Sequence, residues 1–162
     1  MELRKTVRLS MLLALCVVLS ILEGFIPLLN DIIPGLKIGL ANIVIIFTLY
    51  QFSFKDAVYL SVLRVFLVGL LRTGLFGITF FFSLGGALLS IIMMYVSKKL
   101  KLSVIGVSVI GSVFHSIGQI LVAVFLLSMT SFIYYLPYLL ILSVVTGIFI
   151  GIISHKVLSY FA

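Results

Sequence analysis

Three cationic residues, Lys37, Arg64 and Arg72, lie within or directly against long apolar segments of the chain. A charged side chain at the centre of a bilayer costs about 2.5–3.5 kcal/mol, so such residues usually face a partner, a cavity or a ligand. Arginine presents a planar fork of donors that fits a carboxylate or a phosphate. The three residues therefore predict a pocket that binds an anionic group.

Arg64 and Arg72 are eight residues apart, which on a helix separates them by about 12 Å along the axis and about 80° around it. Both can then address one broad face. Two alternatives stay open: Arg64 could pair with Glu23 or Asp56, and Arg72 could extend its charge to the membrane interface. Lys37 is more easily explained as a solvated loop residue.

A second polar row follows at intervals of four residues, through Gly111, His115, Gln119 and Ala123. This spacing places the row on one helix face, which we expect to contact protein or ligand instead of lipid. Asn42 is a further candidate for a buried polar contact. Alternatively, His115 donates a hydrogen bond to a helix carbonyl or to Asn42.

The residue inventory argues against catalysis. The acidic residues are only Glu2, Glu23, Asp31 and Asp56, and they form no cluster of the kind that holds magnesium against a diphosphate. One cysteine and two histidines far apart predict no metal site. No phosphate-binding loop for ATP and no paired nucleophile and base occur. We therefore predict no enzyme activity and no cofactor.

Composition requires that these residues be positioned by membrane helices, because 64% of the 162 residues are hydrophobic and only 9% are charged. A span needs about 20 residues, so the length allows about six helices. Long continuous apolar runs exclude the alternating pattern of a β-barrel. We predict one domain of six transmembrane helices, at residues 7–26, 38–52, 57–71, 78–96, 104–127 and 138–153.

The distribution of charge predicts the orientation. With six spans and a cytoplasmic N-terminus, the inner face receives eight of the eleven basic residues: Arg4, Lys5, Arg8, Lys55, Lys98, Lys99, Lys101 and Lys156. This agrees with the excess of Lys and Arg on cytoplasmic loops. Both termini are then cytoplasmic, and the net charge of +7 reflects topology and not nucleic-acid binding. Small-residue seams at Ser83, Ala87 and Ser90 and at Gly147 and Gly151 predict helix packing.

Four segments together resemble a known family: the run from Pro34 to Ile43, Arg64, the segment Ser83-Leu84-Gly85-Gly86, and the segment His115-Ser116-Ile117-Gly118-Gln119. They are similar to the bacterial membrane proteins called Gx transporters, also labelled heptaprenyl diphosphate synthase component I. Ser116 stands where that pattern is expected to have Asn. The resemblance covers nearly the whole chain.

The resemblance implies a fold similar to the substrate-binding S components of energy-coupling factor vitamin transporters, in the bacterial cytoplasmic membrane. Such components dock to a transmembrane coupling subunit, powered by ATPases, through small residues on the first helix. The corresponding residues here are Ser10, Ala14 and Val18, a seam that is only partly small. In that fold the first loop, which contains Lys37, covers the ligand.

These observations lead to one expected function and one alternative. The expected function is a substrate-binding subunit for uptake of a small, partly apolar anion that is isoprenoid-like or vitamin-like, with Lys37, Asn42, Arg64, Arg72, His115 and Gln119 as candidate ligand-binding residues. The alternative is a non-catalytic membrane subunit that anchors or regulates a prenyl diphosphate synthase.

Overall fold

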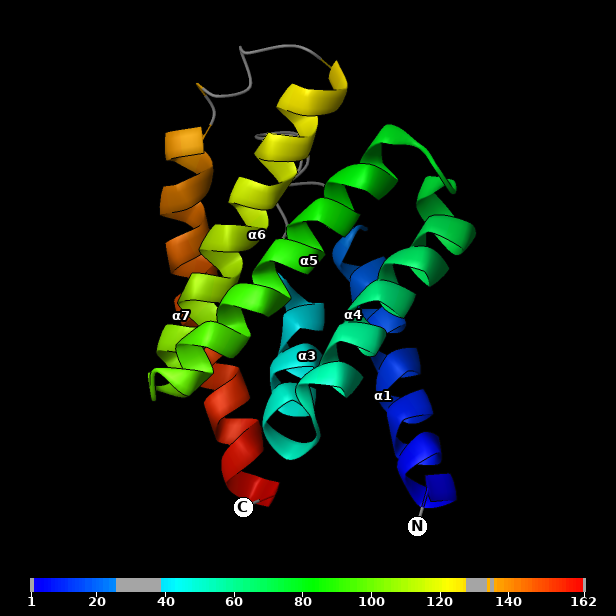
Figure 1. Ribbon diagram of the computed structural model, residues 1–162, viewed down its shortest axis with the longest axis vertical. Coiled ribbons are helices and arrows are strands. Elements are labelled where there is room, and N and C mark those ends of the chain that lie inside the picture. The colour runs from blue at the N-terminus through cyan, green and yellow to red at the C-terminus, as the bar shows by residue number, and fades with distance from the viewer. Residues whose placement is uncertain (1, 26–38, 128–133, 135, 162) are drawn as a thin grey trace.

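The computed structural model describes residues 2–25, 39–127, 134 and 136–161. Within these residues the chain forms six α-helices and one π-helical turn, and no strand (Figure 1). Lys37 and the rest of the predicted first loop lie outside the described residues.

The helices are α1 (Glu2–Glu23), α3 (Leu40–Gln51), α4 (Phe54–Val68), α5 (Ile78–Lys99), α6 (Val104–Leu127) and α7 (Leu136–Phe161), with the π turn η1 (Gly69–Thr73) directly after α4. The bounds of α6 coincide with the predicted range 104–127. α1 and α7 extend beyond their predicted ranges through charged residues: α1 includes Arg4 and Lys5, and α7 includes Lys156. α3 is instead shorter than the predicted range 38–52. Backbone hydrogen bonds hold a helix together whether or not its side chains are apolar.

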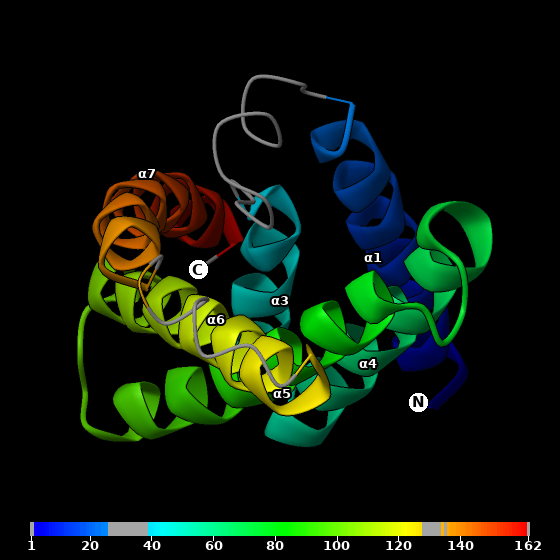
Figure 2. The ribbon, with the colours of Figure 1, turned by 90° about the horizontal axis from the view of Figure 1, so that it is seen from above.

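The helices are arranged around α3. The chain termini lie at the same end of the bundle, which we call the termini end. Seen along the bundle, α1, α4, α5, α6 and α7 follow one another in an arc, and α3 lies within it (Figure 2). Seven of the 12 residues of α3 are buried, so this helix is the centre of the core.

The surface is apolar and the interior carries polar groups. Large hydrophobic side chains point outward all around, among them Met11 at 69%, Phe125 at 85% and Ile141 at 66% exposure. Soluble monomers rarely expose apolar surface on this scale. Four helices are long and apolar enough to cross a membrane, namely α1, α5, α6 and α7. The chain is therefore a helical membrane protein.

The two remaining helices are shorter. α3 is apolar but has only 12 residues, so it rises about 18 Å, well below the roughly 30 Å of a hydrocarbon layer. α4 has 15 residues and is continued by the five residues of η1. Because Figure 1 shows α3 ending at the termini end, its first residue lies partway through the bundle.

The core joins α3 to its neighbours. Ile45, Ile46 and Leu49 of α3 pack in one cluster with Ile91 and Met94 of α5 and with Ile150 of α7. Cys16 of α1, Leu60 of α4 and Val107 of α6 belong to the same cluster. Apolar burial of this kind therefore fixes the position of α3 against the five other helices.

Glycine and serine residues bring α6 and α7 together. A Cβ at Gly147 would lie 2.8 Å from the Val109 Cα, and a Cβ at Gly151 would lie 2.8 Å from the Ile105 Cα. Higher on the same seam the Ser116 and Ser143 hydroxyls are 2.6 Å apart. The predicted packing role of Gly147 and Gly151 is confirmed, and Ser116 forms a hydrogen bond between the two helices.

Basic residues gather at the termini end. α1 and α4 begin there and α5 and α7 finish there (Figure 1), which places Lys5, Lys55, Lys98 and Lys156 on one side of the molecule. Lys98 also has a structural role, because its Nζ donates to the Leu49 carbonyl at 2.6 Å and lies 4.7 Å from the centre of the Tyr50 ring. A cation is favourable at such a helix C-terminus.

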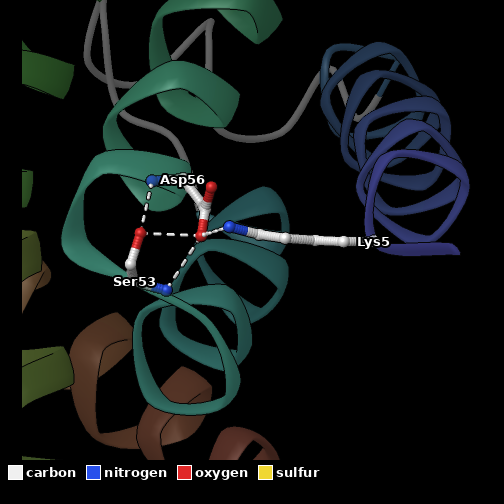
Figure 3. A network of polar contacts seen from close by, with 3 residues as sticks. All are labelled: Lys5, Ser53 and Asp56. Carbon is white, nitrogen blue, oxygen red and sulfur yellow. Dashed lines mark hydrogen bonds and ion pairs between the residues drawn. The ribbon is translucent and has the colours of Figure 1, made fainter. Parts of the chain in front are cut away.

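The start of α4 is fixed by a capping box that is tied to α1 (Figure 3). The Ser53 hydroxyl accepts a hydrogen bond from the Asp56 N–H at 3.2 Å, and the Asp56 carboxylate accepts one from the Ser53 N–H at 3.0 Å. The Lys5 ammonium lies 2.8 Å from the same carboxylate. The capping box satisfies backbone donors that the first turn of a helix leaves open.

This contact predicts a dependence of stability on acid. Burial alone would raise the pKa of Asp56, but hydrogen bonds from Lys5 and Ser53 outweigh it and hold that pKa below its ordinary value. The ionised carboxylate therefore stabilises the fold at neutral pH, and this contribution is lost as the pH falls through the folded-state pKa. Lys5 is half exposed, so the ion pair itself should contribute less than about 1 kcal/mol.

We expect the thermal midpoint of the wild-type protein to fall further between pH 6 and pH 3 than that of Asp56→Asn, measured in the same detergent. Asp56→Asn should also be slightly less stable than wild type at pH 7. Two parallel curves, offset by a constant, would contradict the predicted linkage.

Candidate functional site

Arg64 lies inside the bundle, on the face of α4 that packs against α1 and α3. It is only 9% exposed, and its guanidinium lies beside the thiol of Cys16. Cys16 in turn donates to the Ala41 carbonyl, with 3.5 Å between sulfur and oxygen. Arg64 is thereby placed near the first turn of α3.

The acidic partners considered for Arg64 are engaged elsewhere. Asp56 pairs with Lys5, and the Glu23 carboxylate accepts the Gly39 N–H at 2.6 Å. Lys5–Asp56 is the one ion pair within the described part of the chain, and Arg64 forms none there. A buried arginine without an acid usually needs another anion.

Arg72 lies in η1 and is exposed. Its guanidinium donates a hydrogen bond to the Gly24 carbonyl just past the end of α1, and it lies 5.3 Å from the centre of the Phe25 ring. A Cβ at Gly24 would collide with this guanidinium. Arg72 therefore ties the end of α4 to the end of α1, through a helix C-terminus and a cation–π contact.

The two arginines form equivalent contacts along two neighbouring helices. α1 and α4 run in the same direction (Figure 1), Arg64 lies beside Cys16 and Arg72 beside Gly24. Gly24 follows Cys16 by eight residues, and Arg72 follows Arg64 by eight residues. The two contacts are therefore separated by about 12 Å along each helix. Lys5–Asp56 is a third polar tie at the termini end. Cationic side chains therefore make contacts across the α1–α4 interface at three levels.

His115 and Gln119 face α5 at a close helix crossing. The point at which Gly86 would carry a Cβ lies 3.0 Å from the His115 Cε1, 3.0 Å from the Gln119 Cγ and 2.8 Å from the His115 carbonyl oxygen. Gln119 is buried. At the same crossing a Cβ at Gly118 would lie 2.6 Å from the Gly85 carbonyl oxygen. Glycine on both helices thus permits the approach of His115 and Gln119 to α5.

The start of α3 carries the remaining polar groups. Asn42 is buried in the first turn, and its N–H donates to the Gly39 carbonyl at 2.8 Å. Gly39 itself has a φ of 87°, a left-handed conformation that favours glycine. Arg64, Asn42 and Glu23 are thereby gathered around one helix end, whereas His115 and Gln119 lie on the α5–α6 crossing and Arg72 at the end of α1.

The predicted docking residues all lie on the outward face of α1. Ser10, Ala14 and Val18 are exposed, and the Ser10 hydroxyl donates to the Thr6 carbonyl within the helix. This face is available to lipid or to another protein.

Glu23 and Gly39 form a pair that the sequence did not predict. They are 16 residues apart, with the predicted first loop between them, so no local spacing joins them. One signal was present, because a carboxylate inside an apolar segment is by default a candidate functional residue. The sequence also did not predict the close approach of Gly118 to α5 or the hydrogen bond between Ser143 and Ser116, because each depends on a partner helix.

Burial, charge and helix length define an integral membrane protein with polar side chains in its interior. A sequence profile of the family described as heptaprenyl diphosphate synthase component I matches residues 12–157. The match covers most of the chain, and the protein belongs to this family. No curated protein and no solved structure matches the chain.

Proposed function

We propose that the protein is a substrate-binding membrane subunit for uptake of a small, partly apolar anion of isoprenoid or vitamin type. The observation that carries the proposal is Arg64, which is buried beside the start of α3 and forms no ion pair within the described residues. Its five donors can bind a carboxylate or phosphate at two points at once.

An apolar cluster lies on the face of α4 that packs against α5, next to the face that carries Arg64. Val65, the next residue, is buried with Phe80 and Ala87 of α5. Phe80 lies at the centre of an aromatic cluster, with ring centres 5.1 Å from Phe66 and 5.5 Å from Phe81. Ligand sites commonly combine apolar walls with few polar groups that fix orientation. We therefore favour an anion attached to a hydrocarbon group.

The proposal extends to topology and partners. The basic residues at the termini end support a multi-pass protein of the cytoplasmic membrane with both termini inside. The chain contains no phosphate-binding loop, so energy would come from partner ATPases through a coupling subunit. That subunit would dock on the exposed α1 face that carries Ser10, Ala14 and Val18.

Native mass spectrometry of the gently purified protein tests the proposal. We expect a retained small molecule that carries a carboxylate or phosphate, and we expect cells that express the protein to accumulate the labelled compound. Retention of only neutral or cationic molecules, or retention of an anion without accumulation, would contradict the uptake function.

A second candidate function follows from the family description, in which the word component names one part of a synthase. The protein would then be a non-catalytic membrane subunit that anchors or regulates a soluble prenyl diphosphate synthase. The cationic termini end would suit an acidic partner surface. This candidate predicts copurification of a carboxylate-rich synthase in mild detergent and higher synthase activity on reconstitution, and it fails if neither is observed.

A further inference from the structure

The N-terminus of α3 lies inside the protein. Gly39 precedes the helix without a side chain that could cap it, and Ala41 and Asn42 in the first turn are buried. The first N–H groups of any helix lack intrahelical acceptors and carry partial positive charge. Buried helix ends of this kind are therefore favourable positions for anions.

An internal carboxylate occupies this position. Glu23, the last residue of α1, is 7% exposed, and its Oε1 lies 2.6 Å from the Gly39 nitrogen. Within the described residues this carboxylate forms no ion pair with Arg64 or Arg72. Among the described residues, the group that contacts this carboxylate is the backbone N–H at the start of α3.

Arg64 is an independent sign of an anion at the same place. It is more than nine-tenths buried, and the contact from its neighbour Cys16 to the Ala41 carbonyl brings it to the first turn of α3. In the described part of the chain, no carboxylate pairs with it. The buried guanidinium thus lies next to Cys16, which contacts the first turn of α3, and among the described carboxylates Glu23 binds the helix end and none pairs with Arg64.

We infer that the start of α3 and Arg64 form one oxyanion site, and that Glu23 is an internal competitor that leaves the Gly39 N–H when the anionic group of the ligand binds. This inference rests on the proposed function and specifies its site. The group recognised is a carboxylate or a phosphate, because both accept hydrogen bonds from a guanidinium and from helix N–H groups.

Exchange of Glu23 for a ligand would also change how α1 is held. Glu23 ties α1 to α3, whereas the next residue, Gly24, is tied to Arg72 on η1. Binding would release the first contact and leave the second. The end of α1 would then be attached to α4 and no longer to α3 by these polar groups.

The test uses the full chain in lipid nanodiscs, with hexyl phosphate and hexanoate as anionic probes and hexanol as the neutral control, measured by titration calorimetry. Glu23→Gln keeps the shape of the side chain and removes its charge. We expect it to bind at least one anionic probe about tenfold more tightly than wild type, the factor that corresponds to one charge-assisted hydrogen bond. Hexanol binding should not change.

Asp56→Asn is the matched control, because it removes the same charge at the termini end, where Asp56 pairs with Lys5. It should bind the probes as wild type does. Unchanged or weaker binding by folded Glu23→Gln, or no binding of either anionic probe by this variant, would overturn the inference. If Arg64→Gln weakens probe binding but Glu23→Gln has no effect, the inferred competition by Glu23 is overturned, while anion binding at Arg64, on which the proposed function rests, stands.

Discussion

Gly118→Ala is expected to destabilise the bundle strongly. The added Cβ would lie 2.6 Å from the Gly85 carbonyl oxygen and 2.9 Å from the Gly86 Cα, and both are backbone atoms that cannot rotate away. α5 and α6 would therefore have to move apart at this crossing. Overpacking of this kind costs about 1–3 kcal/mol, so we expect the thermal midpoint in detergent to fall by roughly 2–12 °C.

Gly106→Ala, on the same helix, provides the control. A Cβ there would meet its nearest neighbour, the Ser103 hydroxyl, at 3.4 Å, which is an ordinary contact. Alanine is favoured over glycine in a helix by up to about 1 kcal/mol, so this variant should be as stable as wild type or more stable. We thus expect the same substitution to lower the thermal midpoint at Gly118 and to leave it unchanged or raise it at Gly106. Equal midpoints for the two variants would show that α5 and α6 do not cross as described.

The crossing also shows what the sequence could predict about the fold. The residues of the segments Gly85-Gly86 and His115 to Gln119 identified the family, but a motif does not say which helix each glycine faces. The apolar run of α6 gave its bounds correctly, because Lys101 and Ser103 precede it and the run is continuous. Hydropathy underestimated α7, which continues to Phe161, since a helix persists beyond the apolar layer wherever its backbone hydrogen bonds continue.

The π turn was not predictable from local patterns. The third predicted helix ends at residue 71, whereas the helical backbone continues as η1 to Thr73, so that only residues 74–77 form the connection. Propensities do not distinguish a π turn from an α-helical turn, although π turns frequently occur at functional positions. Here the turn carries Arg72, which contacts the end of α1.

The candidate site was predictable in its charge but not in its geometry. A cation in an apolar segment is costly wherever it lies, so Arg64 could be selected without any structure. Its neighbourhood depends on contacts between α1 and α3, such as Cys16 to Ala41 and Gly39 to Glu23. These contacts link residues 25 and 16 positions apart, and they follow from the tertiary fold alone.

Arg64→Ala should remove binding of the anionic ligand and preserve the fold. Truncating one partner of a buried charged pair costs about 2–5 kcal/mol, which corresponds to a loss of affinity of roughly 30-fold to several thousand-fold. The folded yield should be unchanged or higher, because Arg64 forms no ion pair within the described residues and an unpaired buried charge is itself unfavourable. Titration of the retained ligand, or of hexyl phosphate, against wild type and variant in nanodiscs measures the loss.

Two further variants separate charge, shape and position. Arg64→Lys keeps the charge without the planar fork, so it should restore part of the affinity. Arg72→Ala removes an exposed arginine whose partners are Gly24 and Phe25, so it should lower thermal stability more than affinity. The site would be misassigned if well-folded Arg64→Ala bound the ligand as wild type does, or if Arg72→Ala caused the larger loss of affinity. If Arg72→Ala caused the larger loss, the anion would bind at the end of α1. The buried Arg64 would then serve only to pack α4 against α1.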